Sequence, residues 1–175
     1  GFGEVGTITP LPQPGNAKPR IFRLIEDRAV ISRFGFNSDG HDAAFDRLLR
    51  RQTRPGIVGV NIGANKNSAN RVQDYVLGVR KFYPLASYFC INISSPNTQG
   101  LRNLQARESL AELLIAIKLE RANGKSRHKR DVPVFLKIAP DLTENDLDDI
   151  ADEVLANGID GVIVSNTTLS RVGLV

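Results

Sequence analysis

Short apolar runs alternate with amphipathic stretches along the chain. The runs are rich in β-branched and aromatic residues and bounded by turn residues, which is typical of buried strands. The predicted strands are residues 3–9, 56–63, 88–93, 133–139 and 161–168. Apolar positions at helical spacing predict helices over 41–51, 72–83 and 107–121, and a fourth from the N-cap Thr143 to Gly158. Strand and helix therefore alternate over most of the chain.

A β-hairpin interrupts this alternation after the first strand. Residues 10–16 contain three prolines, Pro10, Pro12 and Pro14, which favour an extended and irregular connection. Two β-rich segments, 20–25 and 29–33, then flank a short polar turn. This arrangement predicts an inserted hairpin.

Polar side chains follow the strands at their carboxyl ends. Alternating strands and helices joined by long connections require a parallel sheet. In an open doubly wound sheet, function gathers near one switch point, whereas every strand end of a closed barrel faces one mouth. The pattern therefore favours an α/β fold that is a partial (β/α)8 barrel with about five of eight strands. The polar strand ends are Thr7 and Thr9, Asn61, Asn92 with Ser95, Lys137, and Ser165, Asn166 and Thr167.

The amino-acid composition narrows the class of protein and the kinds of partner. The chain has 175 residues, 41% hydrophobic and 24% charged, which is typical of one globular domain, and no apolar run approaches the roughly 18 residues of a membrane span. The net charge of +4 is scattered except in residues 125–130, where we expect a solvated loop or, as the alternative, a contact with an acidic partner. No nucleic-acid partner is expected. Cys90 is the sole cysteine, so an internal disulfide is excluded, and its apolar strand indicates a core residue.

Several classes of chemistry are disfavoured by what the strand ends carry. They hold no pair of carboxylates of the kind that glycoside hydrolysis uses. His41 and His128 are too isolated to indicate a metal cluster, and neither a P-loop nor a GxGxxG motif is present. Neutral amides and hydroxyls with one lysine, Lys137, suit a flat partner rich in heteroatoms, such as a flavin ring or a pyrimidine.

The segment 92–102, Asn-Ile-Ser-Ser-Pro-Asn-Thr-Gln-Gly-Leu-Arg, resembles the signature of the class 2 dihydroorotate dehydrogenases. Residues 4–16, 20–24, 34–37, 60–66, 136–142 and 165–168 resemble further blocks of that family in the same order. The resemblance implies a (β/α)8 barrel that binds flavin mononucleotide (FMN). Such an enzyme oxidises dihydroorotate to orotate in pyrimidine synthesis and passes the electrons to a quinone. Ser95 indicates class 2, because class 1 enzymes use a cysteine as the base.

The resemblance also implies a role for each matching residue. Ser95 would take a proton from C5 of dihydroorotate while hydride leaves C6 for the flavin. Because an unassisted serine is a poor base, it would need a proton relay through a neighbouring hydroxyl or water. Lys137 would stabilise the anionic reduced flavin, and Arg23 would line the quinone tunnel. No metal is implied. Substrate contacts are implied for Asn92, Asn97, Asn166 and Thr167, and for Ser32, Arg33, Phe34, Gly35 and Phe36. FMN contacts are implied for Thr7, Asn61, Asn92, Lys137 and Ser165.

Two departures from the family pattern affect these expectations. Ser32 stands where the family usually has asparagine, so we expect weaker substrate binding. The family's membrane-docking part, first strand and last two strands have no counterpart in residues 1–175, which we expect to form a single incomplete FMN-binding domain that is inactive by itself. The loop 98–102 is predicted to be a mobile lid, with Gly100 as a hinge.

The parent enzyme would sit at the mitochondrial inner membrane or, alternatively, at a bacterial cytoplasmic membrane, attached through segments outside this chain. Two rival interpretations remain open. One is another FMN barrel oxidoreductase, such as a class 1 dihydroorotate dehydrogenase. The other is a noncatalytic, truncated remnant.

Overall fold

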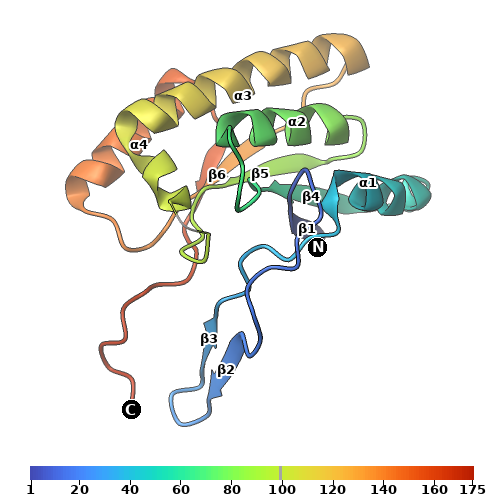
Figure 1. Ribbon diagram of the computed structural model, residues 1–175. Coiled ribbons are helices and arrows are strands. Elements are labelled where there is room, and N and C mark those ends of the chain that lie inside the picture. The colour runs from blue at the N-terminus through green and yellow to red at the C-terminus, as the bar shows by residue number, and fades with distance from the viewer. Residues whose placement is uncertain (99) are drawn as a thin grey trace.

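A parallel five-stranded sheet forms the centre of the molecule in a computed structural model that describes residues 1–98 and 100–175 (Figure 1). Its strands lie side by side in chain order, with no reversal. They are β1 (Phe2–Ile8), β4 (Ile57–Ile62), β5 (Tyr88–Asn92), β6 (Val134–Lys137) and β7 (Gly161–Ile163). An unbroken order of parallel strands is the arrangement of a barrel wall rather than of a doubly wound sheet.

The helices of the described residues cover one face of this sheet (Figure 1). Each helix contacts the next in the chain, so that they form one outer layer. The predicted partial (β/α)8 barrel is thereby confirmed. The helices are α1 (Gly40–Arg51), α2 (Arg71–Phe82), α3 (Arg107–His128) and α4 (Glu144–Ala156).

The side chains of each strand point alternately to the two faces of the sheet, which places the hydrophobic core on one face and the polar strand ends on the other. In β5, Phe89 and Ile91 are fully buried in the core with the helices, whereas Tyr88 and Asn92 face the other way, toward the inside of the arc. In β6, Leu136 belongs to the core and Lys137 lines the inner cavities. The polar strand ends therefore share the inner face.

The predicted hairpin is present as β2 (Ile21–Leu24) paired antiparallel with β3 (Ala29–Ser32). It projects away from the helical layer (Figure 1). Asn16 is held at its base, where its backbone N–H donates to Phe34 O over 2.8 Å.

Two boundaries differ from the prediction by five residues or more. Helix α3 continues to His128, so most of the basic run is helical instead of forming a loop. The helix continues because Gly124 lies directly against the Tyr83 ring, leaving no room for a Cβ, and because basic residues are favourable in a last turn. The last strand is also shorter than predicted. It ends at Ile163, since Val164 no longer belongs to the β6–β7 ladder and is largely exposed.

The predicted lid lies partly within a short 3-10 helix, η1 (Leu101–Gln105). Gln99 lies outside the described residues. Thr98 and Leu101 are 2% and 0% exposed, and Leu101 belongs to the hydrophobic core. In this conformation, the described part of the segment is anchored to the body of the protein. None of the helices within the described residues has the length and apolarity needed to cross a membrane.

Candidate active site

A cavity of about 300 Å³ lies at the carboxyl ends of the strands. It brings together most of the residues that the sequence singled out. They come from strands β1, β3, β4, β5 and β6, the loops that follow β5 and β7, and the segment after the hairpin. They are Thr7, Ser32, Phe34, Gly35, Phe36, Asn61, Asn92, Ser95, Asn97, Lys137, Asn166 and Thr167.

Three polar side chains from neighbouring strands form the floor of this cavity. The Thr7 hydroxyl donates to Asn61 Oδ1 over 2.8 Å, and Asn92 Nδ2 donates to Thr7 Oγ1 over 3.0 Å and to Asn61 Oδ1 over 3.2 Å. Gly6 makes the contact between β1 and β4 possible, because it has a φ of +136° and a Cβ there would lie 2.5 Å from the Asn61 carbonyl oxygen. The strands are thus tied together by the groups that line the cavity.

Glu4 also lines this cavity, beside the three floor residues, and no local pattern in the sequence indicates its role. Asn61 Nδ2 donates to Glu4 Oε1 over 2.9 Å, and the Tyr88 hydroxyl donates to Glu4 Oε2 over 2.9 Å. Burial, with the hydrogen bond to Glu4 and its charge, raises the pKa of Tyr88 to about 12. Burial raises the pKa of the Cys90 thiol to about 12 as well, with Glu4 adding to the shift. Both groups are therefore neutral at physiological pH.

The turn that carries Ser95 is built on Asn92. Its Oδ1 accepts hydrogen bonds from the Ser94 backbone N–H over 3.2 Å and from the Ser94 hydroxyl over 2.8 Å. Ser95 itself is 5% exposed and lines the cavity, and the backbone N–H of Asn97 donates to its Oγ over 3.2 Å. Thr98 Oγ1 is buried and has no hydrogen-bond partner among the described residues.

The segment after the hairpin closes one side of the cavity. Asn97 Nδ2 donates to the Ser32 carbonyl over 3.1 Å, and Asn16 Nδ2 donates to the carbonyl oxygens of Arg33 and Asn97 over 3.1 and 3.3 Å. Phe36 packs over Gly63 so closely that a Cβ at Gly63 would lie 2.8 Å from its ring. The hairpin therefore holds the Ser95 turn and the aromatic segment together.

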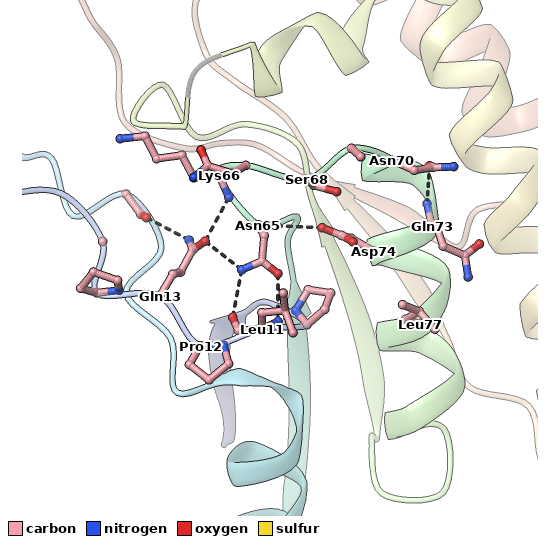
Figure 2. A pocket seen from close by; sticks show the side chains of 16 residues that line it. Leu11, Pro12, Gln13, Asn65, Lys66, Ser68, Asn70, Gln73, Asp74 and Leu77 are labelled. Atoms are coloured by element: carbon pink, nitrogen blue, oxygen red, sulfur yellow. Dashed lines mark hydrogen bonds between the residues drawn. The ribbon is translucent and has the colours of Figure 1, made fainter.

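A second network supports this segment from outside (Figure 2). The Asn65 side chain donates to Leu11 O and to Gln13 Oε1, each over 2.9 Å, and accepts from the Leu11 backbone N–H. Gln13 in turn donates to Phe36 O over 2.8 Å. A cavity of about 720 Å³ lies beside this network, between the proline-rich segment and the start of α2. Of the site residues expected from the sequence, Gly35 is the one that also lines this cavity.

Lys137 and Asn166 face the cavity from the other side. Lys137 is half-buried, and its ammonium group makes no hydrogen bond or ion pair with any described residue. Asn166 Nδ2 donates to the Ser94 carbonyl over 3.0 Å, which leaves its Oδ1 without a partner within the described part of the chain. These two groups offer a cation and an acceptor to a ligand.

Two residues expected at the substrate and FMN site, Arg33 and Ser165, do not line the cavity, and neither does Arg23, which was expected at a quinone tunnel. The Arg33 guanidinium donates to Pro19 O and lies over the Phe22 ring, so it points away from the cavity. The Ser165 hydroxyl donates to the Asn166 carbonyl over 3.0 Å. Arg23 is exposed on β2. The roles of these three residues stay predictions.

Neither histidine lines the cavity, and no cluster of metal ligands was found among the described residues. His41 is buried in α1 with its ring edge-to-face against Phe82, at a centroid distance of 5.3 Å. Burial, followed by the charge of Lys81, lowers its pKa to about 4.

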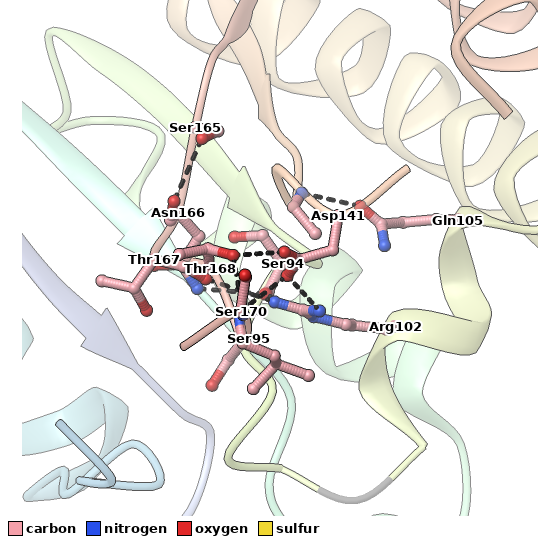
Figure 3. Close-up of polar contacts among 12 residues, drawn as sticks. Ser94, Ser95, Arg102, Gln105, Asp141, Ser165, Asn166, Thr167, Thr168 and Ser170 are labelled. Atoms are coloured by element: carbon pink, nitrogen blue, oxygen red, sulfur yellow. Dashed lines mark hydrogen bonds and ion pairs between the residues drawn. The ribbon is translucent and has the colours of Figure 1, made fainter. Parts of the chain in front are cut away.

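Arg102 does not line the cavity but contacts the loops that do, a role that its predicted place at the end of a lid does not indicate. Its guanidinium lies between the Ser95 turn and the segment that contains Thr167 and Thr168 (Figure 3). Contacts of this kind join distant loops and leave no local signal in the sequence.

Comparison with known proteins gives one consistent result. Residues 1–175 match the family described as Dihydroorotate dehydrogenase. The chain is similar to proteins named Dihydroorotate dehydrogenase (quinone) from three bacteria. The identity is 66% for Allorhizobium ampelinum, 64% for Sinorhizobium medicae and 63% for Brucella ovis. Each match covers 99% of this chain and 48% of the relative.

Two crystal structures of DHODH from Eimeria tenella have the same fold. One, in complex with ferulenol, gives a TM-score of 0.89, and a ligand-free one gives 0.90, both at 44% identity. They cover 98% of this chain and 51% and 53% of the solved chains. The chain thus spans about half the length of the relatives that it matches.

Proposed function

The chain belongs to the dihydroorotate dehydrogenase family, and we propose that the protein carrying it oxidises dihydroorotate to orotate, using bound FMN and a quinone as the final electron acceptor. One observation carries the proposal. The cavity at the strand ends is lined by the residues to which the family resemblance assigns substrate and cofactor contacts. Family membership supports the reaction, and the geometry of the cavity supports the assignment of residues.

The donor set of the cavity fits a flavin. Lys137 contributes a cation without a partner among the described residues, and Thr7, Asn61 and Asn92 contribute a row of neutral polar groups along neighbouring strands. Bound FMN would supply the acceptor for the hydride. Lys137 would place its positive charge where negative charge develops during the reaction. The Ser165 hydroxyl donates to the carbonyl oxygen of the next residue, Asn166. We therefore propose that Ser165 contacts FMN through its backbone or as a secondary contact.

Ser95 is the base in this proposal. It lies within the cavity wall, and the Asn97 N–H donates to its Oγ. A hydrogen bond donated to the oxygen stabilises the anionic form that proton abstraction requires. The hydroxyl of Thr98 is buried and unpartnered among the described residues, and it lies three positions along the same loop. No hydrogen bond joins Thr98 Oγ1 to Ser95 Oγ among the described residues, so the proton relay is assigned to a neighbouring hydroxyl or water and not to Thr98 in particular.

Asn97 and Asn166 hold the substrate. Each uses its Nδ2 within the protein and keeps its Oδ1 free of the described groups, so each can accept a hydrogen bond from a ring N–H of the substrate. Asn92 differs, because both its Nδ2 and its Oδ1 make two hydrogen bonds within the protein. Asn92 can contact a ligand only by exchanging one of these bonds, so its main task is to hold the Ser95 turn. Thr167, Ser32 and the segment Phe34–Phe36 complete the wall.

The names of the relatives support the quinone acceptor and, through it, the location. The three bacterial relatives carry the word quinone in their names. Quinones partition into membranes, so we place the protein at a bacterial cytoplasmic membrane and assign Arg23, exposed on the hairpin, to the quinone path. A class 1 mechanism finds no support at Cys90, because that thiol is buried, is not part of the cavity lining and has a pKa raised to about 12.

The test uses the full-length protein under anaerobic conditions. Dihydroorotate should bleach the absorbance of its bound flavin in a single turnover, and a soluble quinone should restore it. Restoration by fumarate or NAD instead would replace the quinone assignment with a class 1 type of enzyme. No bleaching by dihydroorotate, in protein that retains its flavin, would support the noncatalytic alternative.

A further inference from the structure

The guanidinium group of Arg102 joins three loops that follow three consecutive strands. Its Nε donates to the Ser94 carbonyl over 3.2 Å, in the loop after β5. One terminal nitrogen is ion-paired with Asp141 Oδ2 at 3.0 Å, after β6, and the other donates to the Thr167 carbonyl over 3.4 Å, after β7. Figure 3 shows the group placed between these segments. One side chain thereby spans all three loops.

Asp141 continues the connection toward the last segment. Its carboxylate accepts hydrogen bonds from the Thr168 hydroxyl and, over 3.1 Å, from the Leu169 backbone N–H. These hydrogen bonds, chiefly that from Thr168, lower the pKa of the Asp141 carboxyl below its usual range. The carboxylate is therefore ionised at physiological pH and carries the negative charge that pairs with Arg102.

The two carbonyl groups that Arg102 contacts belong to the catalytic proposal. Ser94 immediately precedes the base Ser95, and its carbonyl accepts a second hydrogen bond, from Asn166 Nδ2 over 3.0 Å. Thr167 lines the cavity next to Asn166. The loop that carries the base and the segment that holds the substrate are thus fixed against each other at one carbonyl oxygen.

We infer that Arg102 is a positioning residue, which sets the distance between Ser95 and the substrate held by Asn166 and Thr167. This inference rests on the proposed function. Three nitrogens in one rigid plane are needed to reach three loops, and arginine provides them whereas lysine provides a single point of charge. A displacement of about 1 Å between reacting groups can cost roughly 10²-fold in rate. Arg102 should consequently affect the chemical step more than it affects binding.

The experiment compares variants of the full-length protein in two measurements. The first is the rate of flavin bleaching at saturating dihydroorotate under anaerobic conditions. The second is the dissociation constant of orotate, measured by calorimetry, which does not depend on turnover. Arg102→Ala should slow bleaching by roughly 10²-fold and weaken orotate binding by less than about fivefold. Arg102→Lys should recover part of the rate, and Asp141→Asn should cause a smaller loss.

Arg107→Ala is the matched control. Arg107 also makes ion pairs across two elements, with Asp149, Asp152 and Glu153, but it lies on the outer layer and does not line the cavity. Its bleaching rate should stay within about twofold of the wild type. If Arg102→Ala cannot be purified in folded form, the same two measurements on Arg102→Lys and Asp141→Asn test the positioning role. Both of these variants retain polar contacts at the site.

The outcomes separate this inference from the proposed function. Wild-type protein that is not bleached by dihydroorotate defeats the proposed function itself. Wild-type protein that is bleached, together with Arg102 variants whose rate is unchanged within about twofold, overturns the positioning role alone. The positioning role is also overturned if the variants weaken orotate binding and bleaching in equal proportion, because that pattern indicates lost binding and not misplacement of the base.

Discussion

The Asn92 amide donates a hydrogen bond to the Thr7 hydroxyl over 3.0 Å, although the two residues are separated by 85 positions in the sequence. Thr7 in turn donates to Asn61, which lies on the strand between them. A single hydroxyl thus satisfies one donor and one acceptor on two other strands. The polar groups that line the cavity also hold the strand ends in register.

Replacing Thr7 by valine should therefore damage both stability and chemistry. Valine keeps the shape but leaves Asn92 Nδ2 and Asn61 Oδ1 each with one partner fewer, which should lower the free energy of unfolding by about 1–3 kcal/mol. The floor of the site should loosen, and flavin bleaching by dihydroorotate should slow by roughly tenfold. Chemical denaturation and anaerobic stopped-flow measure the two effects.

Thr143→Val provides the comparison for this variant. Thr143 caps α4 far from the cavity, where its Oγ accepts from the Asp146 N–H and donates to the Asp146 carboxylate. Its loss should cost about 1 kcal/mol of stability and leave the bleaching rate unchanged. A bleaching rate that is equally unaffected in Thr7→Val would show that the floor network has no role in the reaction.

Ser32 offers a gain-of-function test. It lines the cavity, and its carbonyl accepts from Asn97 Nδ2, so a longer side chain at this position can reach a ligand beside Asn97. Ser32→Asn should lower the Michaelis constant for dihydroorotate by roughly three- to tenfold, the effect of about one added hydrogen bond. Steady-state kinetics of the full-length protein measure this change, and an unchanged or higher constant would refute the assignment of Ser32 to substrate binding.

His41 should make the protein sensitive to acid. Its pKa is lowered from 6.5 to about 4, mainly by burial and then by Lys81, so the folded protein binds this proton less readily than the unfolded chain does. The contribution of neutral His41 to the free energy of unfolding is fully present above pH 6.5, and it is lost as the pH falls from 6.5 toward 4. It should amount to about 3 kcal/mol, all of it lost by the end of this range.

His41→Leu should remove that dependence, and it also eliminates the unpartnered Nε2. The measurement is the free energy of unfolding by urea at intervals between pH 7 and pH 4.5, where most carboxylates remain ionised. Equal slopes for the wild type and His41→Leu would mean that His41 titrates normally in the folded protein.

The part of the site that the sequence predicted is the set of polar residues at the carboxyl ends of the apolar strands. Asn61, Asn92 and Lys137 could be found because each ends an apolar run, and parallel strands present their carboxyl ends at one edge. The β-hairpin was equally accessible, since its turn is a local feature. These predictions required only the period of the pattern and the direction of the strands.

Glu4 and Arg102 could not be found in this way. Glu4 lies in the middle of a strand, and its importance comes from Asn61 and Tyr88 on two other strands. Arg102 contacts groups as distant as Thr167, 65 positions away. The length of α3 was missed for a similar reason, because Gly124 interrupts the helical pattern and is accommodated only by the ring of Tyr83. Each of these features is determined by packing between remote segments.

The identity of the base is the central claim, and one comparison tests it most directly. Ser95→Ala and Cys90→Ala are made in the full-length protein, and bleaching of the bound flavin by dihydroorotate is followed anaerobically. We predict that Ser95→Ala slows bleaching by about 10²–10⁴-fold, the usual contribution of a general base, while Cys90→Ala bleaches within about threefold of the wild type. Normal bleaching in Ser95→Ala, or its loss in folded Cys90→Ala, would contradict the account.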